Sequence, residues 1–178
     1  QLGLFAAAAG LYRYAFMGLR LYYELALSAI YLSASEIELR LRLLGQRDVT
    51  WSEIVNSDNG LFSHKMARAF CPLLRDEVNH QLTLAKKLYR ECSEYVHGTP
   101  LIEQPIPENI QFDEKILRAW HKKSGVMKTT VVFALFMRYH SSITPVSFRG
   151  LEACVLEEIG TIESVRILID SIKRSVDA

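Results

Sequence analysis

The chain has 178 residues, with 21 lysines and arginines against 20 aspartates and glutamates, so its formal net charge is +1. Nine glycines and five prolines in a sequence that is 49% hydrophobic exclude a disordered or collagen-like chain. The near-zero net charge excludes a general polybasic nucleic-acid binder, so any contact with nucleic acid must be local. A chain of this length is expected to form one domain, residues 1–178, with its own hydrophobic core.

The three cysteines, Cys71, Cys92 and Cys154, are widely spaced and form no C-x-x-C pair. An odd number of cysteines without metal-ligand spacing argues against a domain held together by disulfides or zinc. We therefore expect buried free thiols in a reducing cytoplasm, with no metal and no other cofactor. The chain begins with Gln1 rather than Met, so a preceding targeting segment stays open.

Residues 2–19 are apolar enough to raise the question of a membrane span. Arg13 lies inside this stretch and Arg20 follows it directly. A spanning helix needs about 20 apolar residues, and a central arginine opposes insertion by about 2.5 kcal/mol or more. We expect a helix buried in a soluble bundle instead, and no membrane partner.

Apolar residues recur every three or four positions along most of the chain, which predicts helices throughout. Residues 4–44 are predicted to form one long helix or two, with a break at residues 33–35 and a cap at Gly45. Residues 50–53, Thr-Trp-Ser-Glu, form a capping box for a short helix. That helix is expected to end at the polar residues 56–60.

A second short helix is predicted over residues 65–70, where Ser63 can act as its N-cap. After Pro72, a helix of about two dozen residues is expected to run to residue 97 and to stop at Gly98. Residues 99–112 hold three prolines and no helical period, so we predict a loop.

The C-terminal part is predicted to be helical as well. Residues 113–139 form another long helix, with Phe133, Phe136 and Met137 on its buried side. Thr144 and the following proline begin a last helix, whose apolar stripe continues to residue 172. The sequence therefore predicts an all-α fold, an up-and-down helical bundle.

Two Glu-x-x-His pairs, Glu77 with His80 and Glu94 with His97, raise the possibility of a di-iron site. Both pairs fall on one predicted helix, seventeen residues apart, which corresponds to about 25 Å at 1.5 Å per residue. They therefore cannot share a pair of metal ions within one chain. Gly-rich phosphate loops and G-x-S-x-G or H-E-x-x-H motifs are absent.

The C-terminal turns of the same helix carry a more suggestive group. Arg90 and His97 are seven residues apart, which returns to within ~20° of the same helix face, and Glu94 lies between them. An imidazole can move a proton while a guanidinium holds the phosphate of a phosphodiester. The structural alternative is an ordinary Arg90–Glu94 ion pair and a histidine that finishes the helix before Gly98.

The same residues resemble the Arg-x4-6-His motif of HEPN domains: Arg90, six intervening residues, then His97 near a helix end. Residues 89–98, YRECSEYVHG, are similar to HEPN-type proteins of bacterial defence and toxin–antitoxin systems. The resemblance covers mainly residues 20–98 and implies a HEPN-like bundle over 1–98, followed by the loop 99–112 and additional helices at 113–178.

The resemblance also implies a function. Two motifs would meet across a homodimer interface and form one metal-independent endoribonuclease site, with Arg90 and His97 as the catalytic pair and Glu94 orienting one of them. RNA is then the expected substrate, and an antitoxin or another defence protein the expected partner. Glu91 departs from the Asn, Asp or His that often follows the motif arginine. The alternative is a non-catalytic helical module that dimerises, or that binds RNA or protein in a larger assembly.

Several further residues leave two interpretations open. Arg20 and Glu24, one turn apart in an apolar helix, are either an internal ion pair, which we favour, or support for the Arg90 site. The basic stretches 121–123 and 86–87 are expected to be solvated helix surface rather than RNA contacts. Both tryptophans, at 51 and 120, are expected to anchor the core or an interface.

Overall fold

The computed structural model of the chain describes residues 1–97 and 105–174. Within these residues it contains ten α-helices and two short 3-10 helices and no strand, which confirms the all-α prediction. In chain order the elements are α1 Leu2–Ala8, α2 Tyr12–Leu32, α3 Glu36–Leu43, α4 Trp51–Ile54, α5 His64–Phe70, η1 Pro72–Leu74, α6 Val78–His97, α7 Glu114–Tyr139, η2 His140–Ser142, α8 Pro145–Arg149, α9 Glu152–Ile159 and α10 Glu163–Arg174.

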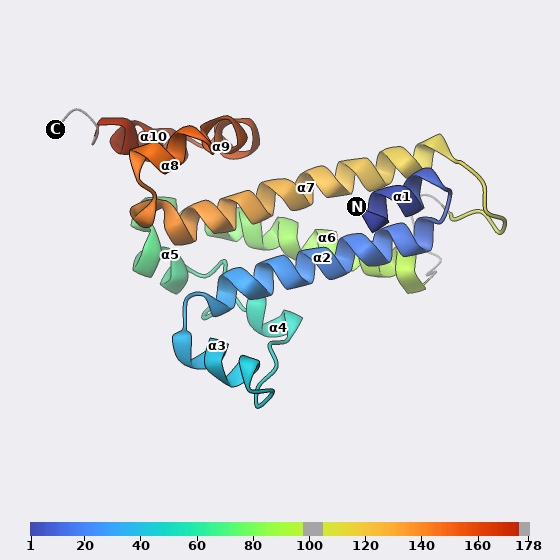
Figure 1. Ribbon diagram of the computed structural model, residues 1–178, viewed down its shortest axis with the longest axis horizontal. Coiled ribbons are helices and arrows are strands. Elements are labelled where there is room, and N and C mark those ends of the chain that lie inside the picture. Colours follow the sequence, from blue (N-terminus) through green and yellow to red (C-terminus); the bar gives the residue numbers. More distant parts are fainter. Residues whose placement is uncertain (98–104, 175–178) are drawn as a thin grey trace.

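Three long helices, α2, α6 and α7, pack side by side and enclose the core, with α6 and α7 running in opposite directions (Figure 1). Phe16 of α2 stacks on Tyr95 of α6 with ring centroids 3.8 Å apart. The hydroxyls of Tyr23 in α2 and Thr130 in α7 lie 2.9 Å apart inside the core. Trp120 of α7 donates to a backbone carbonyl of α2 at 3.1 Å. These contacts fix the rotation of each helix, and so decide which face of α6 is exposed.

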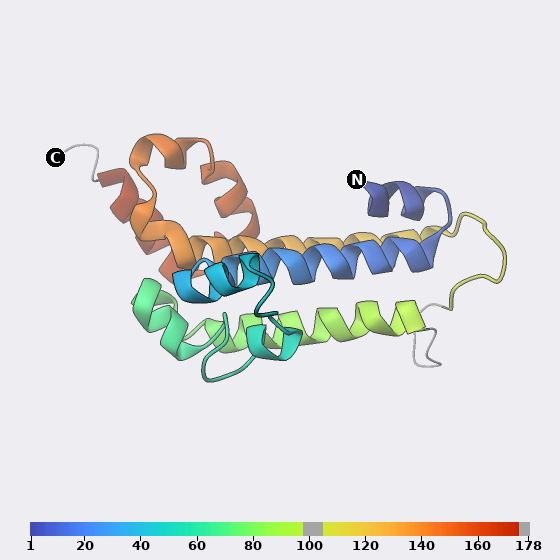
Figure 2. The same cartoon turned by 60° about the horizontal axis from the view of Figure 1, so that its bottom comes forward.

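Shorter helices flank the three-helix core at different places. The α3 and α4 segment lies along one side of α2, and α1 lies against the opposite end of α2 (Figure 2). Helices α8, α9 and α10 form a compact group over the far end of α7.

The predicted helix ends are confirmed where capping residues mark them. Ser63 caps α5 by accepting from the backbone N–H of Met66 at 3.1 Å. Thr50 and Glu53 form both hydrogen bonds of the capping box before α4. Gly45 adopts a φ of +68° just after α3, in the left-handed region that favours glycine. The break at residues 33–35 is also present, between α2 and α3.

The N-terminal segment differs from the prediction in two ways. Residues 9–11 interrupt the helix, because Gly10 turns the chain at a φ of +77°. A Cβ at that position would lie 2.4 Å from the backbone oxygen of Gln111, so only glycine fits. The expectation of a buried helix over residues 2–19 is wrong for α1, where Leu2 and Phe5 are 86% and 71% exposed.

The single helix predicted from Pro145 to residue 172 is wrong, because this range forms three helices, α8, α9 and α10. The second interruption lies at residues 160–162, where a Cβ at Gly160 would come within 2.4 Å of the Leu156 carbonyl oxygen. The Gly160 carbonyl accepts instead from Nε of Arg166, at 2.5 Å. Helix α10 therefore folds back and buries Val165 and Ile169.

The motif helix is shorter than predicted at its start. Pro72 begins a 3-10 turn, and α6 starts only at Val78, so it has 20 residues. Gly98, the predicted stop, and residues 99–104 of the predicted loop lie outside the described residues. Residues 105–112 contain no helix, as predicted.

Two expectations about membranes and thiols can also be compared with the structure. None of the helices in the described ranges has both the length and the apolarity that a membrane crossing requires. Cys71 and Cys92 are buried free thiols, as expected. Cys154, on α9, is free but exposed, so the expectation of burial is wrong for this residue.

Candidate functional site

Helix α6 positions the three predicted catalytic residues, because its apolar residues gather on one face. The buried residues of this helix are Val78, Gln81, Leu82, Ala85, Leu88, Cys92 and Tyr95. Arg90 and His97 are exposed, and Glu94 is partly buried between them. Seven residues are almost two helical turns, so Arg90 and His97 share one exposed face of α6 and are about 10 Å apart along its axis.

Arg90 and Glu94 form a loose ion pair on this face. Nε of Arg90 lies 3.6 Å from Oε1 of Glu94, and the two side chains are 71% and 26% exposed. An exposed i, i+4 pair of this kind contributes only a few tenths of a kcal/mol to stability. The Arg90 side chain therefore stays largely exposed to solvent, with the Glu94 carboxylate beside it.

His97 is the last residue of α6 and is exposed there. An imidazole at this point is accessible to a ligand and can exchange a proton with a bound substrate.

An open depression of about 500 Å³ lies beside Arg90, between α6 and α4. Its lining residues are Trp51, Ser52, Val55, Asn56, Ser57, Lys86, Tyr89 and Arg90. His97 is not one of them. One chain thus places Arg90 and His97 on the same helix face, but the depression contains only the arginine.

A stacked aromatic pair forms one wall of this depression. The rings of Trp51 and Tyr89 are 4.0 Å apart and within 10° of parallel. Arg20 donates to the Tyr89 hydroxyl at 2.6 Å, and its guanidinium carbon lies 4.6 Å from the ring centroid. The same hydroxyl donates to Glu24 at 3.5 Å. Arg20 and Glu24 therefore meet at Tyr89, the neighbour of Arg90, as in the second of the two interpretations left open by the sequence. The favoured ion pair between Arg20 and Glu24 is not among the ion pairs of the described residues.

Glu91, the residue that departs from the HEPN pattern, faces α7 rather than the depression. Its carboxylate pairs with the ammonium group of Lys123, and Lys87 approaches it to 3.8 Å. Lys123 is only 8% exposed, so the expectation that residues 121–123 are solvated helix surface is wrong for this lysine. Glu91 therefore links α6 to α7 through Lys123, and Arg90 pairs with Glu94 instead.

The thiol nearest the candidate site is not available for chemistry. Cys92 follows Arg90 by two residues but faces the core, and burial raises the pKa of its thiol to about 12. A nucleophilic cysteine requires the thiolate, which is scarce at neutral pH for such a thiol. Within the described ranges, no group of three or more His, Cys, Asp and Glu side chains is arranged to hold a metal ion.

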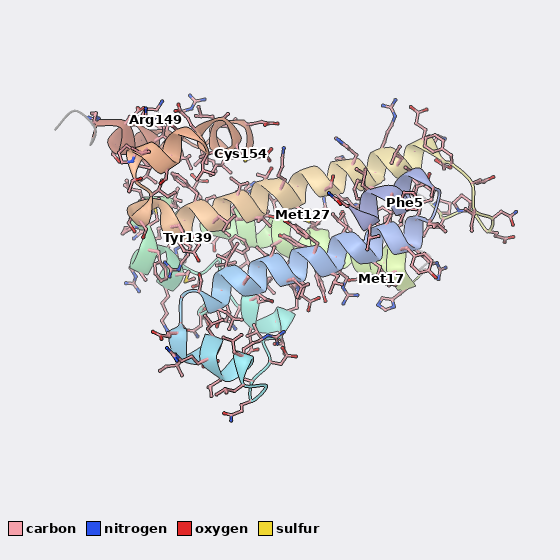
Figure 3. The ribbon with its side chains drawn as sticks, in the orientation of Figure 1. Phe5, Met17, Met127, Tyr139, Arg149 and Cys154 are labelled. Carbon is pink, nitrogen blue, oxygen red and sulfur yellow. The ribbon has the colours of Figure 1, made fainter. Side chains whose placement is uncertain are left out.

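A second surface feature lies on α1 and α2, and sequence periodicity alone did not indicate it. Tyr14, Met17, Leu21 and Leu25 of α2 are between 46% and 64% exposed and follow one another at three or four positions. We call these four residues the α2 stripe. Figure 3 labels Met17 on α2 and the exposed Phe5 on α1. Exposed apolar patches of this kind often mark interaction sites.

We compared the chain with protein-family models, with curated proteins and with solved structures. None of the three comparisons gives a match. Function is therefore inferred from the residues and geometry of α6 and its neighbours.

Proposed function

We propose that this chain is a HEPN-like, metal-independent endoribonuclease of the toxin or antiviral-defence type that acts as a homodimer. The observation that carries the proposal is the exposed face of α6. A guanidinium, a carboxylate and an imidazole follow one another there over about two turns, with Glu94 3.6 Å from Arg90. This set combines a fixed positive charge with an imidazole, a common general acid–base group.

The proposed reaction is an attack of an RNA 2′-hydroxyl on the adjacent phosphate. A bond forms between the 2′-oxygen and phosphorus, and the bond from phosphorus to the 5′-oxygen breaks, which leaves a cyclic phosphate and a 5′-hydroxyl. One His97 accepts the proton of the 2′-hydroxyl, and the His97 of a second copy gives a proton to the leaving oxygen. Arg90 holds the phosphate and stabilises its developing charge, and Glu94 orients Arg90.

A second copy of the chain is part of the proposal for two reasons. In one chain, the depression beside Arg90 does not include His97, so a second α6 face is needed to enclose both groups. The α2 stripe offers an apolar surface for such a copy. Met17 and Leu21 flank Arg20 in sequence, and Arg20 bonds to Tyr89 beside Arg90, so an interface on the stripe would lie next to the α6 face.

The test is cleavage of mixed single-stranded RNA by the purified chain in the presence of a chelator. We expect the wild type to cleave, and Arg90→Ala and His97→Ala each to lose at least about 100-fold in rate, as acid–base and phosphate-binding groups do. His80→Ala is the matched control, because His80 is exposed on the same helix outside this face and should keep full activity.

Equal cleavage by the wild type and both motif variants would contradict the proposal, because the activity would then come from elsewhere. Circular dichroism should show the same helix content for all four proteins, since the three substituted side chains are exposed. Expression in bacteria adds a second readout: growth inhibition by the wild type and not by His97→Ala.

The alternative function is a non-catalytic helical module of a larger assembly. A largely apolar groove of about 640 Å³ between α1, α2 and α7 favours it, because such a groove can receive an apolar segment of another protein. Under this alternative the wild type does not cleave RNA, and Arg90→Ala changes assembly rather than catalysis. The cleavage assay therefore separates the two functions.

A further inference from the structure

A basic groove lies between α6 and α7, and it shares no lining residue with the Arg90 depression. It has a volume of about 410 Å³. Its charged lining residues are Lys87, Glu91, Lys115, Arg118, Lys122 and Lys123. Five of the 21 lysines and arginines thus line one groove with only one of the 20 acidic residues, although the whole chain is almost neutral.

Glu91, the one acidic residue among those that line the groove, is already paired with lining cations. Glu91 pairs with the buried Lys123 and lies 3.8 Å from Lys87. Arg118 shares an exposed ion pair with Glu114, at 2.6 Å, on the rim. Lys115 and Lys122 are exposed and, in the described part of the chain, form no ion pair with an acidic residue. Their charges remain available to an anionic ligand.

The cations follow a regular row along α7. Lys115, Arg118 and Lys122 are three and four residues apart, so they lie on one helix face over about 10 Å. A row of this length matches a ligand with repeated negative charges, such as the sugar-phosphate backbone of a nucleic-acid strand, better than a ligand with one charge. A concave groove also suits a strand better than the flat surface of a membrane.

The groove borders the proposed catalytic face. Lys87 lies on its α6 side, one turn before Arg90 on the same helix. A strand held along α7 can therefore continue across Lys87 to Arg90 without leaving the surface of α6. If the groove supplies most of the phosphate contacts, the Arg90 depression does not need further unpaired cations.

We propose that the α6–α7 groove binds the phosphate backbone of single-stranded RNA, with Lys115 and Lys122 as its main phosphate contacts. The inference rests on the proposed function, because the bound strand is the RNA that Arg90 and His97 cleave. Binding in the groove is sequence-independent, because its contacts reach phosphates and not base edges. The groove positions the substrate, and the α6 face cleaves it.

The experiment measures the affinity of a fluorescein-labelled 20-nucleotide single-stranded RNA by anisotropy, with the full chain and a chelator, at several salt concentrations. It uses the cleavage-deficient His97→Ala background, with Lys115→Gln and Lys122→Gln added together. Two lost phosphate contacts should lower the slope of log affinity against log salt by about 1.4 and weaken binding roughly 25-fold at 0.1 M salt.

The matched control removes the same charge elsewhere. Arg68→Gln with Arg149→Gln changes two exposed cations on α5 and α8, away from the groove, and should keep both slope and affinity within about twofold. Equal losses in the groove pair and the control pair would overturn the proposal, as would no loss in the groove pair. Binding of polyglutamate instead of RNA, with the same lysine dependence, would assign the groove to a protein partner and also overturn it.

The outcome is separable from that of the cleavage assay. If His97→Ala cleaves RNA as fast as the wild type, the proposed active site fails, and the groove is still judged by the lysine dependence of RNA binding. If the lysine pair leaves RNA binding unchanged while His97→Ala abolishes cleavage, the groove proposal fails and the active site stands.

Discussion

Glu91 of α6 and Lys123 of α7 form an ion pair across the interface between the two helices, 32 residues apart in sequence. The side chains are 25% and 10% exposed, and the ammonium group also lies 5.9 Å from the ring centroid of Tyr95. The pair thus joins the residue after Arg90 to the buried side of α7, and so limits how α6 can rotate. The orientation of the candidate catalytic face depends on this contact.

Removal of the buried cation should destabilise the chain. We expect Lys123→Ala to lower the free energy of unfolding by about 2 kcal/mol, because Glu91 is left partly buried without its main partner. The value lies below that of a fully buried pair because Glu91 keeps some solvent and Lys87 stays near it. Urea unfolding followed by circular dichroism measures the change.

Lys122→Ala is the control for this prediction, since Lys122 precedes Lys123 but is exposed. Its effect should stay within about 0.5 kcal/mol. Equal stability of both variants would show that the ion pair contributes nothing measurable.

Tyr89 should contribute to stability through its hydroxyl as well as its ring. Tyr89→Phe keeps the stack on Trp51 but removes the 2.6 Å hydrogen bond from Arg20, so we expect a loss of about 1 kcal/mol. A double-mutant cycle with Arg20→Ala should give a coupling energy of at least about 0.5 kcal/mol. Tyr22→Phe, at a side chain that is 61% exposed, serves as the control and should be neutral.

The α2 stripe should govern self-association. Leu21 is 56% exposed, so Leu21→Glu should leave the fold intact and place a charge in the proposed dimer interface. We expect the wild type to sediment as a dimer and Leu21→Glu as a monomer in analytical ultracentrifugation. Ile37→Glu, at a 72% exposed position on α3, should remain dimeric. A monomeric wild type at all concentrations would contradict the proposed homodimer.

The cysteines should differ sharply in reactivity. Burial raises the pKa of Cys71 to about 11 and that of Cys92 to about 12, whereas Cys154 is exposed. A thiol reagent at pH 8 should therefore modify one thiol per folded chain rapidly, and all three after denaturation. Cys154→Ser should abolish the rapid phase, and a rapid phase that persists in this variant would contradict the burial of the other two.

The same two thiols predict a decrease in stability at alkaline pH. Their pKa values are higher in the folded chain than the ordinary value of 9.0, so the folded state keeps protons that the unfolded state loses. This contribution is fully present below about pH 9 and is lost as the pH rises towards 11 and 12. Urea unfolding at pH 8 and pH 10 should show the decrease, and a constant stability over this interval would contradict it.

Local signals in the sequence predicted much of the fold. Ser63, Thr50 and Gly45 mark helix ends that the structure confirms, because a cap depends on hydrogen bonds to residues only two to four positions away. The breaks at Gly10 and Gly160 were not predicted. At Gly10 the cause is a close approach to Gln111, a residue a hundred positions along the chain, which no local pattern contains.

The sequence by itself determined that Arg90, Glu94 and His97 share one face of α6, since a helix repeats every 3.6 residues whatever surrounds it. Only the tertiary structure decided what faces that helix. The contacts of Tyr89 with Arg20, 69 residues earlier, and of Glu91 with Lys123, 32 residues later, arise from the packing of α2, α6 and α7. Such contacts depend on the complementary shapes of side chains from separate helices, and helical periodicity does not encode them.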